Sequence, residues 1–393
     1  MISLLLRLKR FLGILFGIVY FLSGLIKLMD PVGAGLVMKE YFDFMHLGFM
    51  EPAAKIFGAA FALAETLVGA ALVCGVWRRY VGKIAIALQS IFTLLTLFLY
   101  IYNPEMDCGC FGEAIHLTHS QTFFKNIVLL AMILAYYIPS KHLGETTRRK
   151  YVSFFIVSIS SVAFMIYSLM YIPLVDFTAY KPGAELLSNA SDGGDELYEA
   201  VFTYEKDGKS STFTLEELPE DIDTWTYVGT DTRIKKDIAG SIVELSIFDP
   251  KSQKYVDSIA ADGKALIVSI YDTDIKAATW EKIESLAAEA KECGMKVAIL
   301  ATDTVNLPES LQNSAYTSDF KTLISLNRSN GGATYFNDGI LIKKWAERVL
   351  PSADEIKEIT AADPTEVVID YQSKGSLGFQ GFLLYVFAVM LLL

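Results

Sequence analysis

Two cysteines separated by a single glycine are the residues of this sequence with the clearest chemical potential. Cys108 and Cys110 enclose Gly109. Fully extended, residues two positions apart lie about 7 Å from each other, near the limit for a disulfide bridge. The loop must therefore bend, which glycine permits. A disulfide closed in this way would be strained and easily reduced, as a redox-active pair requires. The alternative is a structural bridge that pins a loop over helices.

Two histidines follow the cysteines, so metal binding must also be considered. His116 and His119 complete the pattern C-x-C-x5-H-x2-H, which contains four side chains of the type that bind soft metals. The spacing matches no standard zinc pattern, and His-x-x-His at the start of a helix is common by chance. We expect surface histidines here and no metal site.

A carboxylate and an amine lie within apolar segments of the chain. Glu65 falls near the middle of one such segment, where a charge is costly, so it must find a partner inside a helical bundle or be protonated. Lys27 lies near the end of the preceding apolar segment and is within reach of Glu65 as an intramembrane polar pair. The alternative for Lys27 is to extend to the membrane interface.

The composition restricts the class of protein that can present these residues. Hydrophobic residues make up 52% of the 393 residues and charged residues 20%, with a mean hydropathy of +0.37. Soluble proteins carry roughly a quarter charged residues, so the values argue against a wholly soluble enzyme. The net charge of −11 argues against a nucleic-acid partner. Four cysteines are too few for a disulfide scaffold.

The two halves of the chain differ in charge. Residues 1–175 contain 14 Lys and Arg against 9 Asp and Glu, whereas residues 176–393 contain 20 against 36. The charges are therefore +5 and −16. A hydrophobic, slightly basic half followed by an acidic half predicts a membrane domain in residues 1–175 and a soluble region after it.

Apolar segments long enough to cross a bilayer appear mainly in the first half. Five are expected, at Phe11–Met29, Ala53–Trp77, Val81–Tyr102, Thr122–Pro139 and Tyr151–Ile172. Residues 376–393 form a sixth candidate at the end of the chain. Lysines and arginines cluster before the first segment and in alternate connections, which predicts a cytoplasmic N-terminus. The cysteine loop and the acidic region would then face outward.

The acidic region divides into two parts. Residues 176–262 read as a linker with a β-hairpin, whose strands flank Asp207 and Gly208. In residues 263–372 we expect strand, helix, strand, helix, hairpin and helix, at residues 265–271, 279–293, 295–302, 319–326, 334–345 and 352–359. This order resembles the thioredoxin fold, so an extracytoplasmic α/β domain is predicted.

The residues that give a thioredoxin its redox activity are missing from this part of the sequence. A C-x-x-C motif would fall near Ile275–Ala278, where a helix N-terminus would lower the thiol pKa, and no cysteine is present. Gly331 stands where a cis-proline would precede the hairpin. Cys293 is expected to be a small buried hydrophobe. We therefore predict a thioredoxin-like module without redox activity, for binding or docking.

Several motifs of the chain together resemble the DoxX/MauE group of redox-associated membrane proteins, in the long version found in Bacteroidetes with a thioredoxin-like domain after the bundle. The resemblance is carried by Tyr20–Gly24, Lys27, Asp30-Pro31, Glu65, Asp107–Gly112 and Thr122–Asn126. It implies a DoxX-like bundle of four to five spans and a role in thiol or redox homeostasis outside the cytoplasm. MauE is implicated in maturation during methylamine utilization, and DoxX relatives in quinone-coupled thiol or sulfur oxidation, so a quinone is the implied cofactor.

Two functions from different classes remain open at this point. In the first, Cys108 and Cys110 exchange thiols with an extracytoplasmic protein partner or pass electrons to a quinone, which would make the chain a thiol-disulfide or quinone-linked oxidoreductase. In the second, the pair is a structural disulfide in a non-catalytic assembly or docking factor. The related arrangement in vitamin K epoxide reductase needs two cysteine pairs, whereas this chain offers one, which weakens the enzymatic interpretation.

Overall fold

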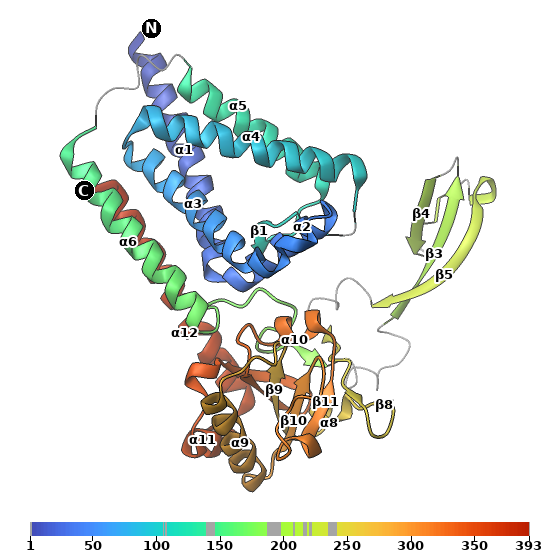
Figure 1. The fold of residues 1–393 in the computed structure, drawn as a ribbon. Coiled ribbons are helices and arrows are strands. Elements are labelled where there is room, and N and C mark those ends of the chain that lie inside the picture. The colour runs from blue at the N-terminus through green and yellow to red at the C-terminus, as the bar shows by residue number, and fades with distance from the viewer. Residues whose placement is uncertain are drawn as a thin grey trace. The chain divides into compact units, whose positions relative to one another are not determined.

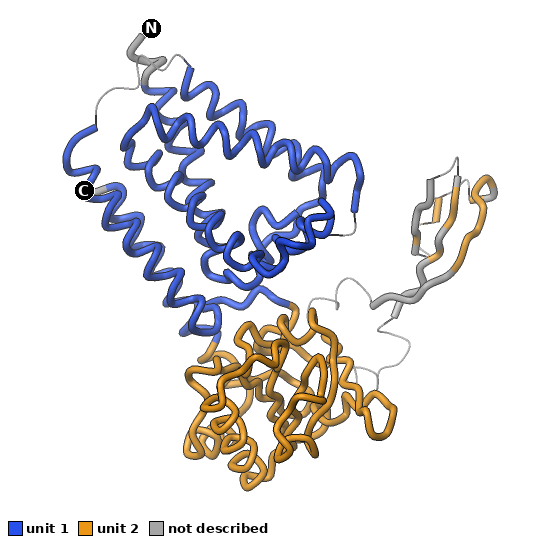
Figure 2. The backbone as a smooth tube through the Cα atoms, in the orientation of Figure 1, with its two compact units in different colours: residues 1–178, 372–393 blue, residues 179–371 orange. Residues whose placement is uncertain are grey.

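A computed structural model describes residues 2–104, 106, 108–138, 146–186, 198–206, 209–214, 218–219, 222–234 and 242–392. The chain divides into two compact units, shown in different colours in Figure 2. The first comprises Met1–Thr178 with Gln372–Leu393, and the second comprises Ala179–Tyr371.

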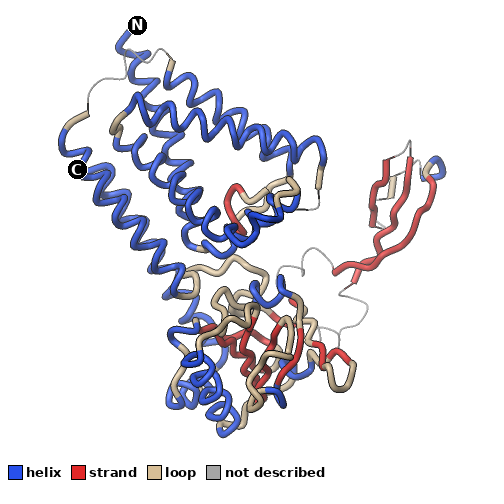
Figure 3. The backbone as a smooth tube through the Cα atoms, in the orientation of Figure 1, coloured by secondary structure: helices blue, strands red, loops and turns tan. Residues whose placement is uncertain are grey.

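The first unit is built from helices (Figures 1 and 3). Its helices are α1 (Ile2–Met29), α2 (Pro31–Phe44), α3 (Ala54–Cys74), α4 (Arg78–Tyr102), α5 (His119–Tyr137), α6 (Arg148–Met170) and, from Gln372 on, α12 (Pro364–Leu392). A 3₁₀-helix at Gly48–Ala53 precedes α3, and the short strand β1 (Cys110–Glu113) lies between α4 and α5. These elements enclose one hydrophobic core, to which α1 and α3 contribute most.

Five of these helices are long and apolar enough to cross a membrane, among the residues that the structure describes. They are Arg7–Met29, Gly48–Cys74, Arg78–Tyr102, Arg148–Met170 and Pro364–Leu391. The prediction of a multi-pass membrane protein is confirmed. The last helix begins earlier than the expected residue 376, at Pro364.

The expected span at Thr122–Pro139 is not among these five helices. The segment does form a helix, α5, which packs against α1 and α4. Its first half is polar, with the sequence His-Ser-Gln-Thr at its start and Lys125-Asn126 a turn later, so its mean hydropathy stays lower than that of the five. Pro139 lies outside the described residues.

Small residues bring α1 and α3 close together. A side chain at Gly24 of α1 would collide with Thr66, and one at Gly69 of α3 would collide with the backbone of Phe21. Backbones that approach this closely bring the polar side chains of both helices within contact distance, as small residues do at helix interfaces in membranes. This contact sets Lys27 on α1 beside Glu65 on α3.

The helix α2 (Pro31–Phe44) was not predicted from the sequence. Its start is nevertheless encoded locally. The carboxylate of Asp30 accepts a hydrogen bond from the N–H of Gly33 at 2.8 Å, and Pro31 occupies the first turn, where its missing N–H has no cost. The apolar run that follows was too short to be considered a span, and α2 instead packs on α3.

The second unit contains a nine-stranded sheet among its described residues, in the order β6-β2-β13-β12-β9-β10-β11-β7-β8. The strands are β2 (Glu185–Leu186), β6 (Ile242–Val243), β7 (Phe248–Asp249), β8 (Lys254–Tyr255), β9 (Lys264–Ile270), β10 (Lys296–Ala301), β11 (Ala315–Thr317), β12 (Gly332–Asn337) and β13 (Ile340–Trp345). The helices are α8 (Ser258–Ala261), α9 (Ala277–Glu292), α10 (Phe320–Leu326) and α11 (Ala353–Ala361), with 3₁₀-helices at Gln312–Ser314 and Glu347–Val349.

The expected order of elements after residue 263 is present in this sheet. β9 and β10 pair in parallel around α9, whereas β12 and β13 form an antiparallel hairpin beside β9. Gly294 ends the turn after α9 with a positive φ of 76°. The sheet does not begin at residue 263, however. Four short strands from residues 176–262 pair into it, because the sheet edges accept strands from distant parts of the chain.

A three-stranded sheet, β4-β3-β5, accounts for the rest of the predicted linker region. The strands β3 (Tyr198–Lys206) and β4 (Lys209–Thr214) pair antiparallel, as the hairpin prediction requires. Asp207 and Gly208, which were expected to form the turn, lie outside the described residues. The third strand, β5 (Thr226–Ile234), follows a 3₁₀-helix at Ile222–Thr224 and was not predicted.

Candidate functional site

The loop between α4 and α5 presents Cys108 and Cys110, and α2 covers it. Gly109 has a φ of +61°, and any side chain there would collide with Val37 of α2. The glycine is therefore required for both the backbone conformation and the close approach. Cys108 is buried, Cys110 is partly exposed, and the structure holds both as free thiols.

Two hydroxyl groups from different helices hold this loop by its backbone. Tyr41 on α2 donates a hydrogen bond to the carbonyl of Cys108 at 3.0 Å. Ser23 on α1 donates to the carbonyl of Cys110 at 2.8 Å. The carbonyls on both sides of Gly109 are therefore anchored to separate helices, so the positions of the two sulfurs depend on how α1 and α2 pack.

The two thiols differ in acidity. The pKa of Cys108 is lowered to about 5, chiefly because the thiol of Cys110 donates a hydrogen bond to its sulfur. Burial opposes this shift, while the hydroxyl of Thr122, 3.0 Å from the Cys108 sulfur, and the charge of Lys125 favour the thiolate. The pKa of Cys110 is raised well above its ordinary value, first because its thiol is hydrogen-bonded to Cys108 and second because its partial burial disfavours the charged form. The hydrogen bond between the two thiols therefore favours the thiolate at Cys108 and the protonated thiol at Cys110.

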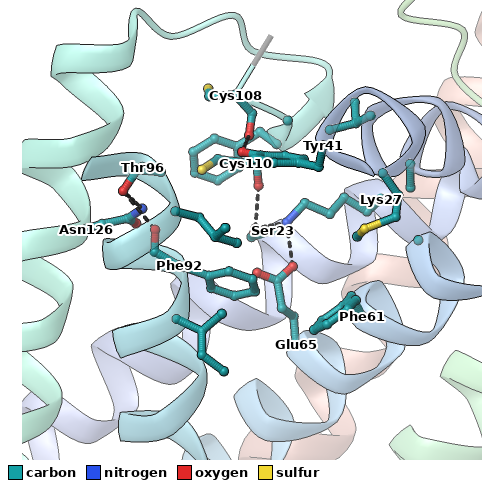
Figure 4. A pocket seen from close by; sticks show the side chains of 18 of the residues that line it. Ser23, Lys27, Tyr41, Phe61, Glu65, Phe92, Thr96, Cys108, Cys110 and Asn126 are labelled. Atoms are coloured by element: carbon teal, nitrogen blue, oxygen red, sulfur yellow. Dashed lines mark hydrogen bonds and ion pairs between the residues drawn. The ribbon is translucent and has the colours of Figure 1, made fainter. Parts of the chain in front are cut away.

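An ion pair lies below the cysteine loop, within the helices (Figure 4). Lys27 Nζ is 2.5 Å from Glu65 Oε2, and the two side chains are 14% and 7% exposed. Lys27 also donates to the hydroxyl of Ser23 at 3.2 Å. A continuous chain of contacts thus runs from Glu65 through Lys27 and Ser23 to the backbone of Cys110.

The cysteines and the ion pair line the same cavity, which has a volume of about 380 Å³. Small-molecule sites in proteins measure about 300–1,000 Å³. Most of the lining is apolar, with Phe61 and Phe92 among the side chains that face the interior in Figure 4. The polar groups Lys27, Glu65 and Cys110 converge on one part of the wall, and convergent polar groups within an apolar lining are usual in a small-molecule site.

A second polar network lines the cavity from α4 and α5. Tyr20 donates to Gln89 at 2.7 Å, and Gln89 donates to the carbonyl of Asn126 at 3.0 Å. The amide of Asn126 donates to Thr96 at 3.1 Å. Sequence reasoning missed Gln89 and Tyr41. A glutamine in the middle of an apolar span was the available signal for Gln89, whereas nothing local distinguishes Tyr41 from other tyrosines.

The two histidines lie apart from this chemistry. His116 is exposed, and His119 begins α5. Within the described residues there is no group of three or more histidines, cysteines, aspartates or glutamates that could hold a metal ion. Cys74 is buried near the other end of α3, and Cys293 packs against the core of the second unit.

Comparison with known families adds to this geometry. Residues 5–139 match the family described as methylamine utilisation protein MauE. This match and the five apolar helices support a MauE-type membrane protein. The matched residues include α1 to α5 and every residue that lines the cavity. Residues 198–237, which contain the three-stranded sheet, match a domain of unknown function, DUF8463. No curated protein and no solved structure matches the chain.

Proposed function

We propose that this MauE-type protein is a membrane thiol–disulfide oxidoreductase whose active pair is Cys108 and Cys110. The observation that carries the proposal is that two thiols, hydrogen-bonded to each other, line a largely apolar cavity together with the ion pair of Lys27 and Glu65. A structural disulfide needs neither a stabilised thiolate nor access to a cavity, whereas an exchanging pair needs both.

The residues around the cavity suit a quinone as the electron acceptor. An apolar wall would hold the ring, and the ammonium of Lys27 and the two thiols supply the polar contacts at one end. When bound there, a quinone supplies an acceptor for two electrons and two protons. Cys108 and Cys110 give up two electrons and the shared proton as their sulfurs join in a disulfide, and the second proton comes from solvent.

The disulfide is then returned to the dithiol state by a client protein. A client thiolate attacks one sulfur of the Cys108–Cys110 disulfide, and the other sulfur leaves as a thiolate. A second client thiolate attacks the mixed disulfide, so that the client gains a disulfide and the pair regains two thiols. The net reaction moves two electrons from the client to the acceptor in the membrane.

We place the client outside the cytoplasm, by the distribution of lysines and arginines, and assign the second unit to docking it. The strand order around β9, β10, β12 and β13 supports a thioredoxin-like module. The name of the matched family suggests that the client belongs to methylamine utilisation. The oxidation of a partner's cysteines would then be a step in its maturation.

The midpoint potential of the pair tests this function. The full chain in detergent is equilibrated in dithiol buffers of graded potential, alkylated, and analysed by mass spectrometry at Cys108 and Cys110. We expect a potential well above about −300 mV, the upper limit for structural disulfides. Oxidation of a model dithiol by the quinone-supplied protein should fall to background in the Cys108→Ser and Cys110→Ser variants. Cys74→Ser and Cys293→Ser are the controls and should keep the wild-type rate.

A non-catalytic docking function is the second candidate, and one observation in the second unit favours it. At the junction after β9, where a thioredoxin carries its cysteines, the amide of Asn330 bonds the N–H groups of Tyr271 and Asp272 and the carbonyl of Asp272. The junction is thereby closed without a thiol. A pair that stays oxidised until strongly reducing conditions, with dithiol oxidation unchanged in both serine variants, would establish this function instead.

A further inference from the structure

A second hollow of the first unit lies between α2 and α4, beside the cavity that holds the thiols. Its volume is about 470 Å³. Six of the seven side chains that line it are apolar or aromatic, and Phe98 and Tyr102 of α4 are 42% and 67% exposed. Both belong to a helix that is long and apolar enough to cross a membrane.

The hollow and the cavity share three side chains. Tyr41 and Met45, at the end of α2, and Leu95 of α4 line both. Beyond these shared residues, the rings of Phe44 and Tyr102 meet across the two helices, with centroids 6.2 Å apart. The two spaces are therefore neighbours that have these side chains in common.

The lining becomes less polar along the path that leads from the thiol cavity to the hollow. Its inner end holds Lys27, Glu65 and the cysteines, whereas its outer end is lined almost entirely by apolar and aromatic groups. A molecule that fills both spaces must have a compact polar head and a long apolar tail. The thiols of a client protein have no such tail, and neither does a water-soluble oxidant.

We propose that this hollow, lined by Phe44, Phe98 and Tyr102, is a lateral portal that binds the apolar tail of the quinone-class oxidant while its head lies in the thiol cavity. The proposal rests on the proposed function, because that function supplies the oxidant. It adds the route of entry, which is sideways from the bilayer, and the residues that select a tailed molecule over one without a tail.

A binding experiment with reduced probes tests the portal without requiring turnover. Full-length protein in phosphatidylcholine vesicles is reduced, and alkylation of Cys108 and Cys110 is followed by mass spectrometry. Two quinols with the same ring serve as probes, one with a ten-carbon tail and one without a tail; neither can oxidise the thiols. We expect the tailed quinol to protect the cysteines at a concentration at least about tenfold lower, because apolar area is buried in the hollow.

A matched pair of substitutions on α4 isolates the hollow. Phe98→Lys places a charge in its lining, whereas Leu94→Lys places the same charge on the same helix, at a residue that lines neither space and is 53% exposed. Phe98→Lys should abolish the advantage of the tailed quinol, and Phe98→Leu and Leu94→Lys should preserve it. An unchanged ratio between the two probes in Phe98→Lys, including an equal loss of both, overturns the portal.

The same samples separate this proposal from the function on which it rests. Addition of the oxidised, tailed quinone to the reduced protein reports disulfide formation at Cys108 and Cys110. Protection by the tailed quinol without any disulfide formation would contradict the proposed function and leave the portal in place. Disulfide formation with equal protection by both probes would contradict the portal alone.

Discussion

The loop of Cys108 and the loop after β9 are the two parts of this molecule where thiol chemistry would be expected, and only the first contains cysteines. In the first, two hydrogen-bonded thiols lie beside a cavity, under hydroxyl groups from α1 and α2. In the second, Asn330 bonds the backbone, and Gly331, at a φ of +78°, donates its N–H to the carbonyl of Ser269 at 2.8 Å. The second loop therefore lacks the sulfur that thiol chemistry requires, whereas the first presents two thiols within three residues.

The largest expected effect concerns the thiol pair itself. Cys110→Ala removes the hydrogen bond that contributes most to the low pKa of Cys108. The pKa of Cys108 should therefore rise from about 5 toward the ordinary value of about 8.5 for a free cysteine. Since only the thiolate reacts, alkylation of Cys108 should lose most of its rate between these two pH values. The pH profile of alkylation, followed on the Cys108 peptide, measures the shift.

The control for this prediction is Cys74→Ala, which should leave the profile of Cys108 unchanged, because Cys74 lies outside the cavity lining. If the pH profile of Cys108 alkylation in Cys110→Ala matched the wild type, the hydrogen bond from Cys110 would not be what lowers the pKa of Cys108. The two loops would then differ only in whether they contain cysteines.

The second effect concerns the ion pair that underlies the cysteine loop. Glu65→Gln leaves the buried ammonium of Lys27 without its partner, and breaking a buried pair in this way costs about 3–5 kcal/mol. Thermal unfolding of the detergent-solubilised protein should show the loss. The double variant Lys27→Met, Glu65→Leu should recover most of it, because no isolated charge remains.

The exposed pair of Lys39 and Glu51, 3.0 Å apart, provides the matched control. Glu51→Gln should change the unfolding temperature far less than Glu65→Gln, because solvent screens that pair. Equal effects from the two substitutions would mean that Lys27 and Glu65 are solvated in the membrane protein, and that the cavity is not the apolar site described above.

The smallest effect on activity is expected in the second unit. Asn330→Ala removes the hydrogen bonds that close the loop after β9 and should lower the stability of this unit by about 1–3 kcal/mol. Quinone-dependent oxidation of a small dithiol should stay at the wild-type rate. Limited proteolysis measures the stability of the second unit, and the oxidation assay measures the activity. A loss of small-dithiol oxidation in this variant would place chemistry in the second unit and contradict the division of roles.

Much of the fold was open to prediction because its signals are local. Apolar length revealed the spans of α1, α3, α4 and α6, short apolar runs revealed β9 and β10, and a turn signal revealed the hairpin of β12 and β13. The missed helix α2 has Asp30 as its N-cap and Pro31 in its first turn. It is too short to span a membrane, and the sequence around it shows no helical period. β5 and the short strands before residue 263 depend on distant partners, so no local pattern could place them.

The candidate site shows the same division. The sequence by itself determined that the chain carries a C-x-C pair, a carboxylate within an apolar helix, and no cysteine in the loop that follows β9, because each of these is a property of a short segment. Only the tertiary structure decided that Lys27 meets Glu65, that Tyr41 and Ser23 hold the two carbonyls of the loop, and that all of these groups surround one cavity. These contacts join residues far apart in the chain, and they depend on how closely α1 and α3 approach at Gly24 and Gly69 and on how α2 folds back over the loop. Such distances follow from packing, which the order of residues along one helix does not reveal.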